Sequence, residues 1–122
     1  MTEHDFSARL VHFYIHENDR HGAMLLWQWL LEEANRLGIR GGTAFQAMAG
    51  FGQHHALHER HFFELAGTLA VKVEFVVSPT EADELLAVAS KTQRAIFYTI
   101  TPALFGILNA TGPVPQSPGS PE

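Results

Sequence analysis

The stretch LAVKVEFVVSPTEADELLAVAS, residues 69–90, contains the clearest secondary-structure signals in the chain. Its first half alternates between two kinds of residue, with Val71, Val73, Phe75 and Val77 separated by residues that include Lys72 and Glu74. A period of two is typical of a strand with one face in a core, so we expect a strand over residues 69–77. The SPTE sequence that follows, residues 78–81, has the Ser, Pro and Glu spacing of a capping box and predicts an immediate helix start.

The segments on either side extend this pattern to a complete fold. Upstream, Val11, Phe13 and Ile15 alternate with polar or aromatic residues and predict a strand over residues 9–16. We further expect a helix over residues 22–37 that ends at Gly38, and strands over residues 43–51 and 95–101. The resulting order is βαββαβ, which predicts an α+β, ferredoxin-like sandwich: a four-stranded antiparallel sheet with two helices on one face.

Such a sandwich leaves one face of its sheet without helices. The residues expected on that open face include His12, Tyr14, Lys72 and Glu74. The first helix is also apolar over more than one side, because Trp27 adds to the stripe that its other apolar residues form. Both features favour an oligomer, since exposed apolar surface of this extent is usually covered by a partner.

Length and composition limit the classes of protein to which this chain can belong. The 122 residues fit one domain, which we place at residues 8–109, followed by a Pro-, Ser- and Gly-rich tail at residues 110–122 that we expect to be disordered. The net charge of −5 argues against nucleic acid as a partner. Cysteine is absent, and neither a secretory signal nor a membrane span is apparent, so we expect a cytoplasmic protein without membrane insertion.

Three short motifs lie around the predicted first helix and second strand. They are HENDRHG at residues 16–22, GIRGGT at residues 38–43 and GFG at residues 50–52. In order and spacing they resemble a bacterial and archaeal PII-like family, catalogued as domain of unknown function number one hundred and ninety. The resemblance extends over residues 9–88, about two thirds of the chain.

This resemblance implies a homotrimer with a regulatory role similar to that of PII signalling proteins, which bind adenine nucleotides such as AMP or ATP in clefts between subunits. By position, the residues that would line or shape this cleft are Asp19, Arg20, His21, Gly22, Gly50, Phe51 and Gly52. The chain departs from the family where Ala23, Met24 and Gln46 stand in place of frequent basic residues. These departures remove positive charge from the expected cleft.

The same residues also have structural interpretations, which the sequence leaves open. Arg20 and His21 precede a predicted helix N-terminus, where they could bind an anion or form an exposed salt bridge. The glycines of residues 50–52 would allow a ligand close to the backbone, or simply a tight exit from a strand. Lys91 and Arg94 lie between the second helix and the last strand, where we expect solvated charges.

A cluster of histidines gives a second functional hypothesis. If the connection is helical, His54, His58 and His61 share one face and could bind a divalent metal such as zinc, nickel or copper. The protein would then serve metal binding or metal tolerance, similar in shape to trimeric CutA proteins. The structural alternative is a solvated connection whose histidines titrate near neutral pH.

No set of residues in the sequence resembles catalytic machinery, so we do not expect an enzyme. Residues 52–67 occupy the position of the PII loop that contacts other proteins, which makes them the predicted surface for a protein partner. A purely structural oligomerisation module, without any ligand, is the third alternative.

Overall fold

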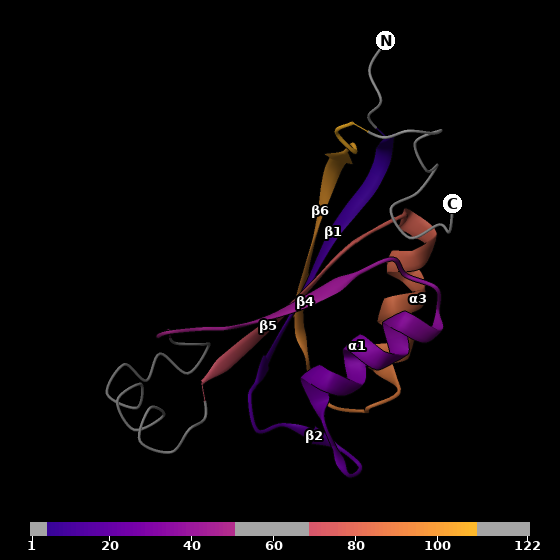
Figure 1. Ribbon diagram of the computed structural model, residues 1–122. Coiled ribbons are helices and arrows are strands. Elements are labelled where there is room, and N and C mark those ends of the chain that lie inside the picture. The colour runs from indigo at the N-terminus through magenta and orange to yellow at the C-terminus, as the bar shows by residue number, and fades with distance from the viewer. Residues whose placement is uncertain (1–4, 51–68, 110–122) are drawn as a thin grey trace.

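The computed structural model describes residues 5–50 and 69–109 and confirms the predicted α+β, ferredoxin-like architecture (Figure 1). Its elements in chain order are β1 (Asp5–His16), β2 (Arg20–His21), β3 (Met24–Leu25), α1 (Leu26–Arg36), β4 (Gly42–Gln46), β5 (Ala70–Val77), α3 (Pro79–Ser90) and β6 (Phe97–Phe105). The histidine cluster and the tail at residues 110–122 lie outside the described residues.

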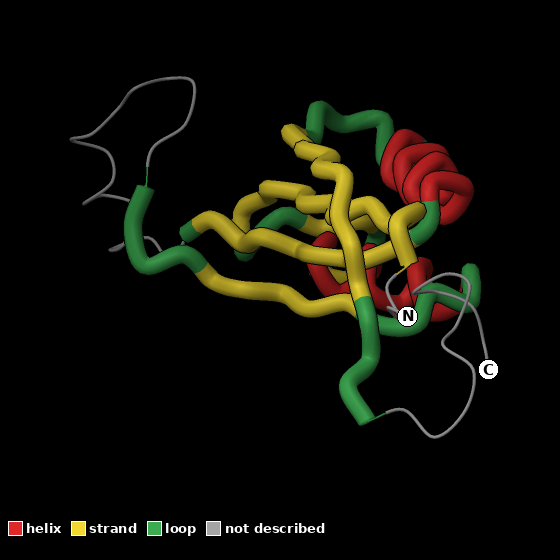
Figure 2. The backbone as a smooth tube through the Cα atoms, turned by 90° about the horizontal axis from the view of Figure 1, so that it is seen from above, coloured by secondary structure: helices red, strands yellow, loops and turns green. Residues whose placement is uncertain are grey.

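The main sheet has the order β4-β5-β1-β6, and every neighbouring pair is antiparallel. β1 is therefore a central strand, and β4 and β6 are the edges. The strands twist strongly along their length (Figure 2), as sheets of L-amino acids do. Both α1 and α3 cover the same face of this sheet (Figure 1), which leaves the other face open as predicted.

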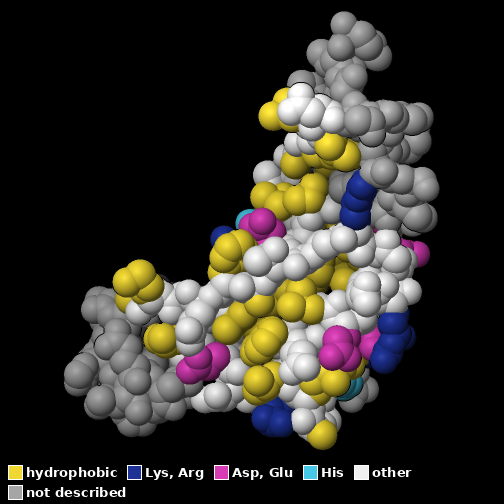
Figure 3. All heavy atoms as spheres, in the orientation of Figure 1, with side chains coloured by type: hydrophobic (Ala, Val, Ile, Leu, Met, Phe, Trp, Pro, Cys, Tyr) yellow, Lys and Arg dark blue, Asp and Glu magenta, His cyan; other side chains and the backbone are white. Residues whose placement is uncertain are grey.

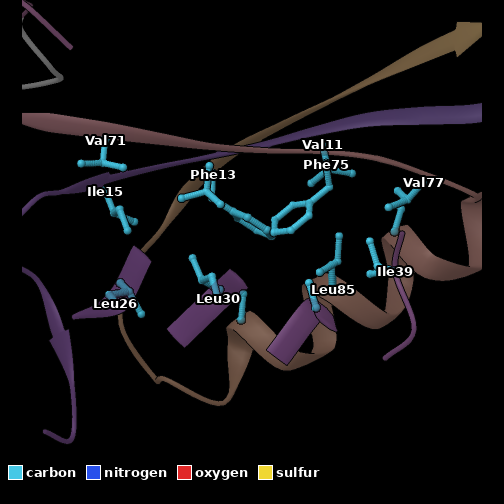
Figure 4. Close-up of a cluster of buried hydrophobic side chains, with 14 residues drawn as sticks. Val11, Phe13, Ile15, Leu26, Leu30, Ile39, Val71, Phe75, Val77 and Leu85 are labelled. Atoms are coloured by element: carbon cyan, nitrogen blue, oxygen red, sulfur yellow. The ribbon is translucent and has the colours of Figure 1, made fainter. Parts of the chain in front are cut away.

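The core lies between the helices and the covered face of the sheet (Figure 4). The alternation read from the sequence places the side chains correctly, because Val73 and Phe75 of β5 are buried while Lys72 and Glu74 are only partly covered. Phe13 packs edge-on against Phe75, with ring centroids 6.3 Å apart. Each such buried side chain contributes about 1.5–3 kcal/mol relative to an exposed one.

Gly42 lies directly beside this core. It is paired with Phe75 in the register of β4 and β5, and the Phe75 ring lies across the space that a side chain at residue 42 would occupy. A Cβ added to Gly42 would lie 2.6 Å from Cδ1 of Phe75 and 3.1 Å from Cδ2 of Leu31. The glycine therefore allows the ring to cover the edge strand from the core side.

The helix start predicted at residues 78–81 is confirmed in detail. The backbone N–H of Glu81 donates to the Ser78 hydroxyl at 3.1 Å, and the backbone N–H of Ser78 donates to the Glu81 carboxylate at 2.8 Å. Pro79 occupies the first turn, where its missing N–H costs no hydrogen bond. Both halves of the capping box are thus present.

The first helix differs from the prediction at its start. It begins at Leu26 instead of residue 22, because residues 20–25 form the small β2–β3 hairpin. Gly22 has a φ of +63°, in the left-handed region that turns favour and helices exclude. The helix ends as predicted, with Gly38 at a φ of +85° after its last turn.

The outer strands also differ in length from the prediction. β4 ends at Gln46, well before residue 51, which is itself outside the described residues. β6 continues to Phe105 because β1 begins at Asp5 and supplies a partner along this extra length. Pro102 is tolerated within β6 because that strand is an edge of the sheet.

Candidate functional site

The candidate site is built where β1 leaves the sheet and the β2–β3 hairpin begins. Asp19 closes the turn after β1, since its backbone N–H donates to the His16 carbonyl at 3.0 Å. Its carboxylate Oδ2 accepts the backbone N–H of His16 at 3.1 Å. Its carbonyl accepts the backbone N–H of Leu26 at 2.7 Å, so Asp19 also fixes the first residue of α1.

The hairpin presents two of the predicted site residues. The Arg20 guanidinium is exposed and donates to the carbonyl of Ala23 at 2.6 Å. The His21 ring packs against Trp29 of α1, with centroids 4.3 Å apart and the planes tilted by 50°. Gly22 forms the turn between them and the second strand of the hairpin. The hairpin is therefore held against α1 through His21 and leaves Arg20 facing solvent.

Arg94 joins this group from the other end of the chain. Its Nη1 lies 3.2 Å from Oδ1 of Asp19, and its Nη2 donates to the carbonyl of Arg20 at 3.1 Å. Figure 1 shows the connection after α3 returning beside the hairpin. Gln93 directly precedes it with a φ of +59°, an uncommon conformation for a residue other than glycine.

The structure adds a partner to the expectation that Arg94 is a solvated charge, because the residue is exposed and its guanidinium also pairs with Asp19. The side chains of Arg94 and Asp19 are 38% and 26% exposed, so the pair is partly withdrawn from water. Sequence periodicity could not find this contact, because 74 residues separate Arg94 from Arg20. The available signal was topological: the connection between the last helix and the last strand returns to the sheet end where β1 finishes.

Gly50 is the remaining described member of the predicted set, and it follows β4 at the same end of the sheet. There the backbone N–H of Glu17 donates to the carbonyl of Leu69, and that of Ala47 donates to the carbonyl of Ala70, both at 2.8 Å. Gln46 donates its side-chain amide to the carboxylate of Glu17. Gly50 is exposed, with nothing within 4 Å of an added Cβ.

The structure thus brings Asp19, Arg20, His21 and Gly22 together and places Gly50 at the same sheet end, whereas Phe51 and Gly52 lie outside the described residues. The charged groups at this end of the sheet are the guanidinium groups of Arg20 and Arg94 and the carboxylates of Asp19 and Glu17. Guanidinium groups grip phosphate or carboxylate through two parallel hydrogen bonds, so the chemistry suits an anion. Because the Asp19 carboxylate already pairs with the Arg94 guanidinium, an anion that binds Arg94 must displace this carboxylate.

No metal centre is found in the part of the chain that the structure describes. Residues of the kinds that bind metals form no group of three close enough to hold an ion there. The predicted metal ligands His54, His58 and His61 lie outside those residues. None of the helices in the described ranges has the length and hydrophobicity needed to cross a bilayer.

Comparison with known proteins agrees with this fold. The family model DUF190, described as "Uncharacterized ACR", matches residues 8–103. The chain belongs to this family. DUF190 is a PII-like family of unknown function, so the resemblance inferred from the three motifs is confirmed.

A UPF0166 protein of Aquifex aeolicus (strain VF5) is 29% identical over 68 residues, which is 56% of this chain and 65% of the relative. The chain thus spans slightly less than two thirds of the length of this relative.

Proposed function

We propose that the protein is a PII-like, trimeric regulatory protein that binds a small anionic ligand, an adenine nucleotide such as AMP or ATP, beside the β2–β3 hairpin. The observation that carries this proposal is the meeting of Arg20, Arg94 and Asp19 at one end of the sheet. Membership of a PII-like family supports it independently. The role is non-enzymatic and cytoplasmic in this proposal, and residues 52–67 would contact a protein partner.

Within this proposal, the nucleotide phosphates bind the exposed guanidinium of Arg20 first. Among the described residues that group donates to a main-chain carbonyl, that of Ala23, which a stronger acceptor can replace. Arg94 would contribute once the ligand displaces Asp19 from it. The missing basic residues at Ala23, Met24 and Gln46 predict weaker binding than in relatives that keep them. Salt screens the attraction between exposed arginines and phosphates, so nucleotide binding should be stronger at low ionic strength.

The test is a calorimetric titration of AMP and of ATP into metal-free protein at low salt. We expect saturable binding near one site per chain, reduced at least tenfold by Arg20→Ala. Arg36→Ala is the matched control, because Arg36 is also an exposed arginine, and its side chain pairs with Glu33 at the far end of α1. Absence of heat with both nucleotides, or an equal loss in the two variants, would contradict the proposal.

A second candidate function rests on the histidine-rich segment, which offers three imidazoles at helical spacing. In this case the protein binds a divalent metal, and zinc is the probe. Replacing His54, His58 and His61 with Ala should abolish zinc binding measured by calorimetry and leave nucleotide binding unchanged. Zinc affinity that survives the triple substitution would exclude this candidate.

A further inference from the structure

The Arg94 side chain joins the β2–β3 hairpin to the connection that follows α3. Its Nη1 lies 3.2 Å from Oδ1 of Asp19, and its Nη2 donates to the carbonyl of Arg20 at 3.1 Å. One guanidinium thus contacts the residue before the hairpin and the first residue within it. A guanidinium binds phosphate through the same kind of paired N–H donors. Docking of the hairpin and binding of an anion to Arg94 therefore compete.

Hydrogen bonds to the last turn of α3 fix the backbone just before Arg94. The backbone N–H of Thr92 donates to the carbonyl of Ala89 at 3.2 Å, and that of Gln93 donates to the carbonyl of Ser90 at 3.1 Å. The Thr92 hydroxyl donates to the same Ala89 carbonyl at 2.8 Å. Arg94 is therefore presented from a fixed support, and the hairpin is the part that moves when the two separate.

The hairpin itself has little internal support. Its strands pair at two positions, Arg20 with Leu25 and His21 with Met24. A two-stranded hairpin this short depends on contacts with its surroundings, because alone in water it is at best marginally stable. The hairpin forms the lower end of the molecule in Figure 1, where basic and histidine side chains reach the surface in Figure 3. Loss of the two Arg94 contacts therefore weakens its attachment directly.

Asp19 connects this attachment to the start of α1. Its Oδ1 faces Arg94, its Oδ2 accepts the backbone N–H of His16 at 3.1 Å, and its carbonyl accepts the backbone N–H of Leu26 at 2.7 Å. Leu26 is 0% exposed, so water cannot replace this acceptor while the segment stays in place. A movement of Asp19 away from Arg94 therefore exposes the first N–H of the helix.

We infer that the Asp19 carboxylate is a built-in competitor of the ligand at Arg94, and that a bound phosphate group releases the hairpin and the first turn of α1. The inference rests on the proposed function for the anionic ligand and adds the regulation of that site. Because hairpin docking and ligand binding share one guanidinium, each must weaken the other by the same factor. A partly exposed ion pair sets this factor at roughly two- to fivefold.

Calorimetric titration of inorganic pyrophosphate and of ATP into metal-free protein tests the competition, since pyrophosphate carries linked phosphates without the nucleoside. Asp19→Asn should raise the affinity for both probes roughly two- to fivefold, because its amide oxygen can still accept the His16 N–H and no carboxylate occupies Arg94. Asp19→Ser keeps a hydroxyl acceptor and should act in the same direction. Glu33→Gln is the matched control, because it removes the carboxylate that pairs with Arg36 and changes the net charge equally. Its affinity should equal that of wild type.

Hydrogen exchange of single backbone N–H groups, followed by NMR, tests the reverse direction. Saturating pyrophosphate should accelerate exchange at Leu26, although a ligand ordinarily slows exchange in the protein that binds it. The N–H of Ala82, which donates to the carbonyl of Ser78 at 2.9 Å at the start of α3, is the control and should not accelerate. In Arg94→Ala, which lacks both hairpin contacts, pyrophosphate should cause no further acceleration at Leu26.

Structural damage lowers affinity, so a gain identifies competition. Unchanged or lower affinity in both Asp19 variants, with circular dichroism showing that they fold, would overturn the inference, as would slower exchange at Leu26 with pyrophosphate. If pyrophosphate produces both effects and neither AMP nor ATP binds, the competition is supported and the nucleotide of the proposed function is contradicted. Binding of ATP that depends on Arg20 but produces neither effect would support the proposed function and exclude the competition. Absence of binding by every probe would overturn both.

Discussion

Replacing Gly42 with alanine tests the packing between the edge strand β4 and the core. The added Cβ would lie 2.6 Å from Cδ1 of Phe75 and 3.1 Å from Cδ2 of Leu31, both shorter than any comfortable carbon–carbon contact. Phe75 is 1% exposed, and its ring already contacts Phe13, so it has little space into which to move. The substitution therefore forces the strand or the ring out of place.

The expected change in the free energy of unfolding is the sum of two opposing effects. Overpacking a filled core costs about 1–3 kcal/mol, while replacing glycine with alanine restricts the unfolded chain and returns about 0.4–1 kcal/mol. The net prediction is a free energy of unfolding lower by about 1–2 kcal/mol. Gly41→Ala is the control, because nothing lies within 4 Å of a Cβ at that neighbouring position. It should leave stability unchanged or raise it slightly.

Urea unfolding followed by circular dichroism measures both variants. With a denaturant dependence of about 1–3 kcal/mol per molar urea, the midpoint of Gly42→Ala should fall by roughly 0.5–1 M. In a Phe75→Leu background the smaller side chain leaves room for the new methyl group, so Gly42→Ala should lower the unfolding midpoint by less than it does in wild type. A double-mutant cycle measures this coupling. Equal midpoints for Gly42→Ala and Gly41→Ala would refute the reasoning.

Three further predictions concern the helix starts and the hairpin. Ser78→Ala should lower the free energy of unfolding by about 1 kcal/mol in urea titrations because it removes a capping-box acceptor, whereas Ser90→Ala at the other end of α3 should change it little; equal effects would contradict the capping role. Arg94→Ala should accelerate hydrogen exchange at the backbone N–H of Leu26, because the ion pair that steadies its acceptor is lost; unchanged exchange would show that the pair does not order the hairpin. Gly22→Ala should destabilise by about 1 kcal/mol from its positive φ alone, and Gly22→Asn by less; equal stability of all three proteins would argue against a strained turn.

The sequence predicted the elements whose signals are local. The alternation around Val73 and Phe75, and the capping box at Ser78, specify their own structure with neighbours only one to three residues away. The βαββαβ order then leaves few arrangements for a sheet covered on one face, which is why the architecture was predicted correctly.

The predictions differ from the structure at positions where contacts between distant segments determine the local conformation. The helix α1 begins at Leu26, later than predicted, because the preceding residues form the β2–β3 hairpin. The apolar periodicity of the helix gives no information about that hairpin. β6 extends to Phe105 because β1 reaches Asp5, a pairing between opposite ends of the described chain. The candidate site shows the same limit, since its motif residues around Asp19 were predicted, whereas Arg94 depended on the three-dimensional return of the last connection.

The central position of β1 has a consequence for the order in which the chain acquires structure during synthesis. Its two neighbours are β5 and β6, so Phe13 finds its partner Val73 only after most of the chain has been made, and Tyr98 later still. Until then an apolar strand leaves the ribosome with neither edge paired. Pairings this distant in sequence form slowly and leave strand edges open to other chains. Nascent chains released early should therefore aggregate, and chaperones that hold extended apolar segments should bind the first strand.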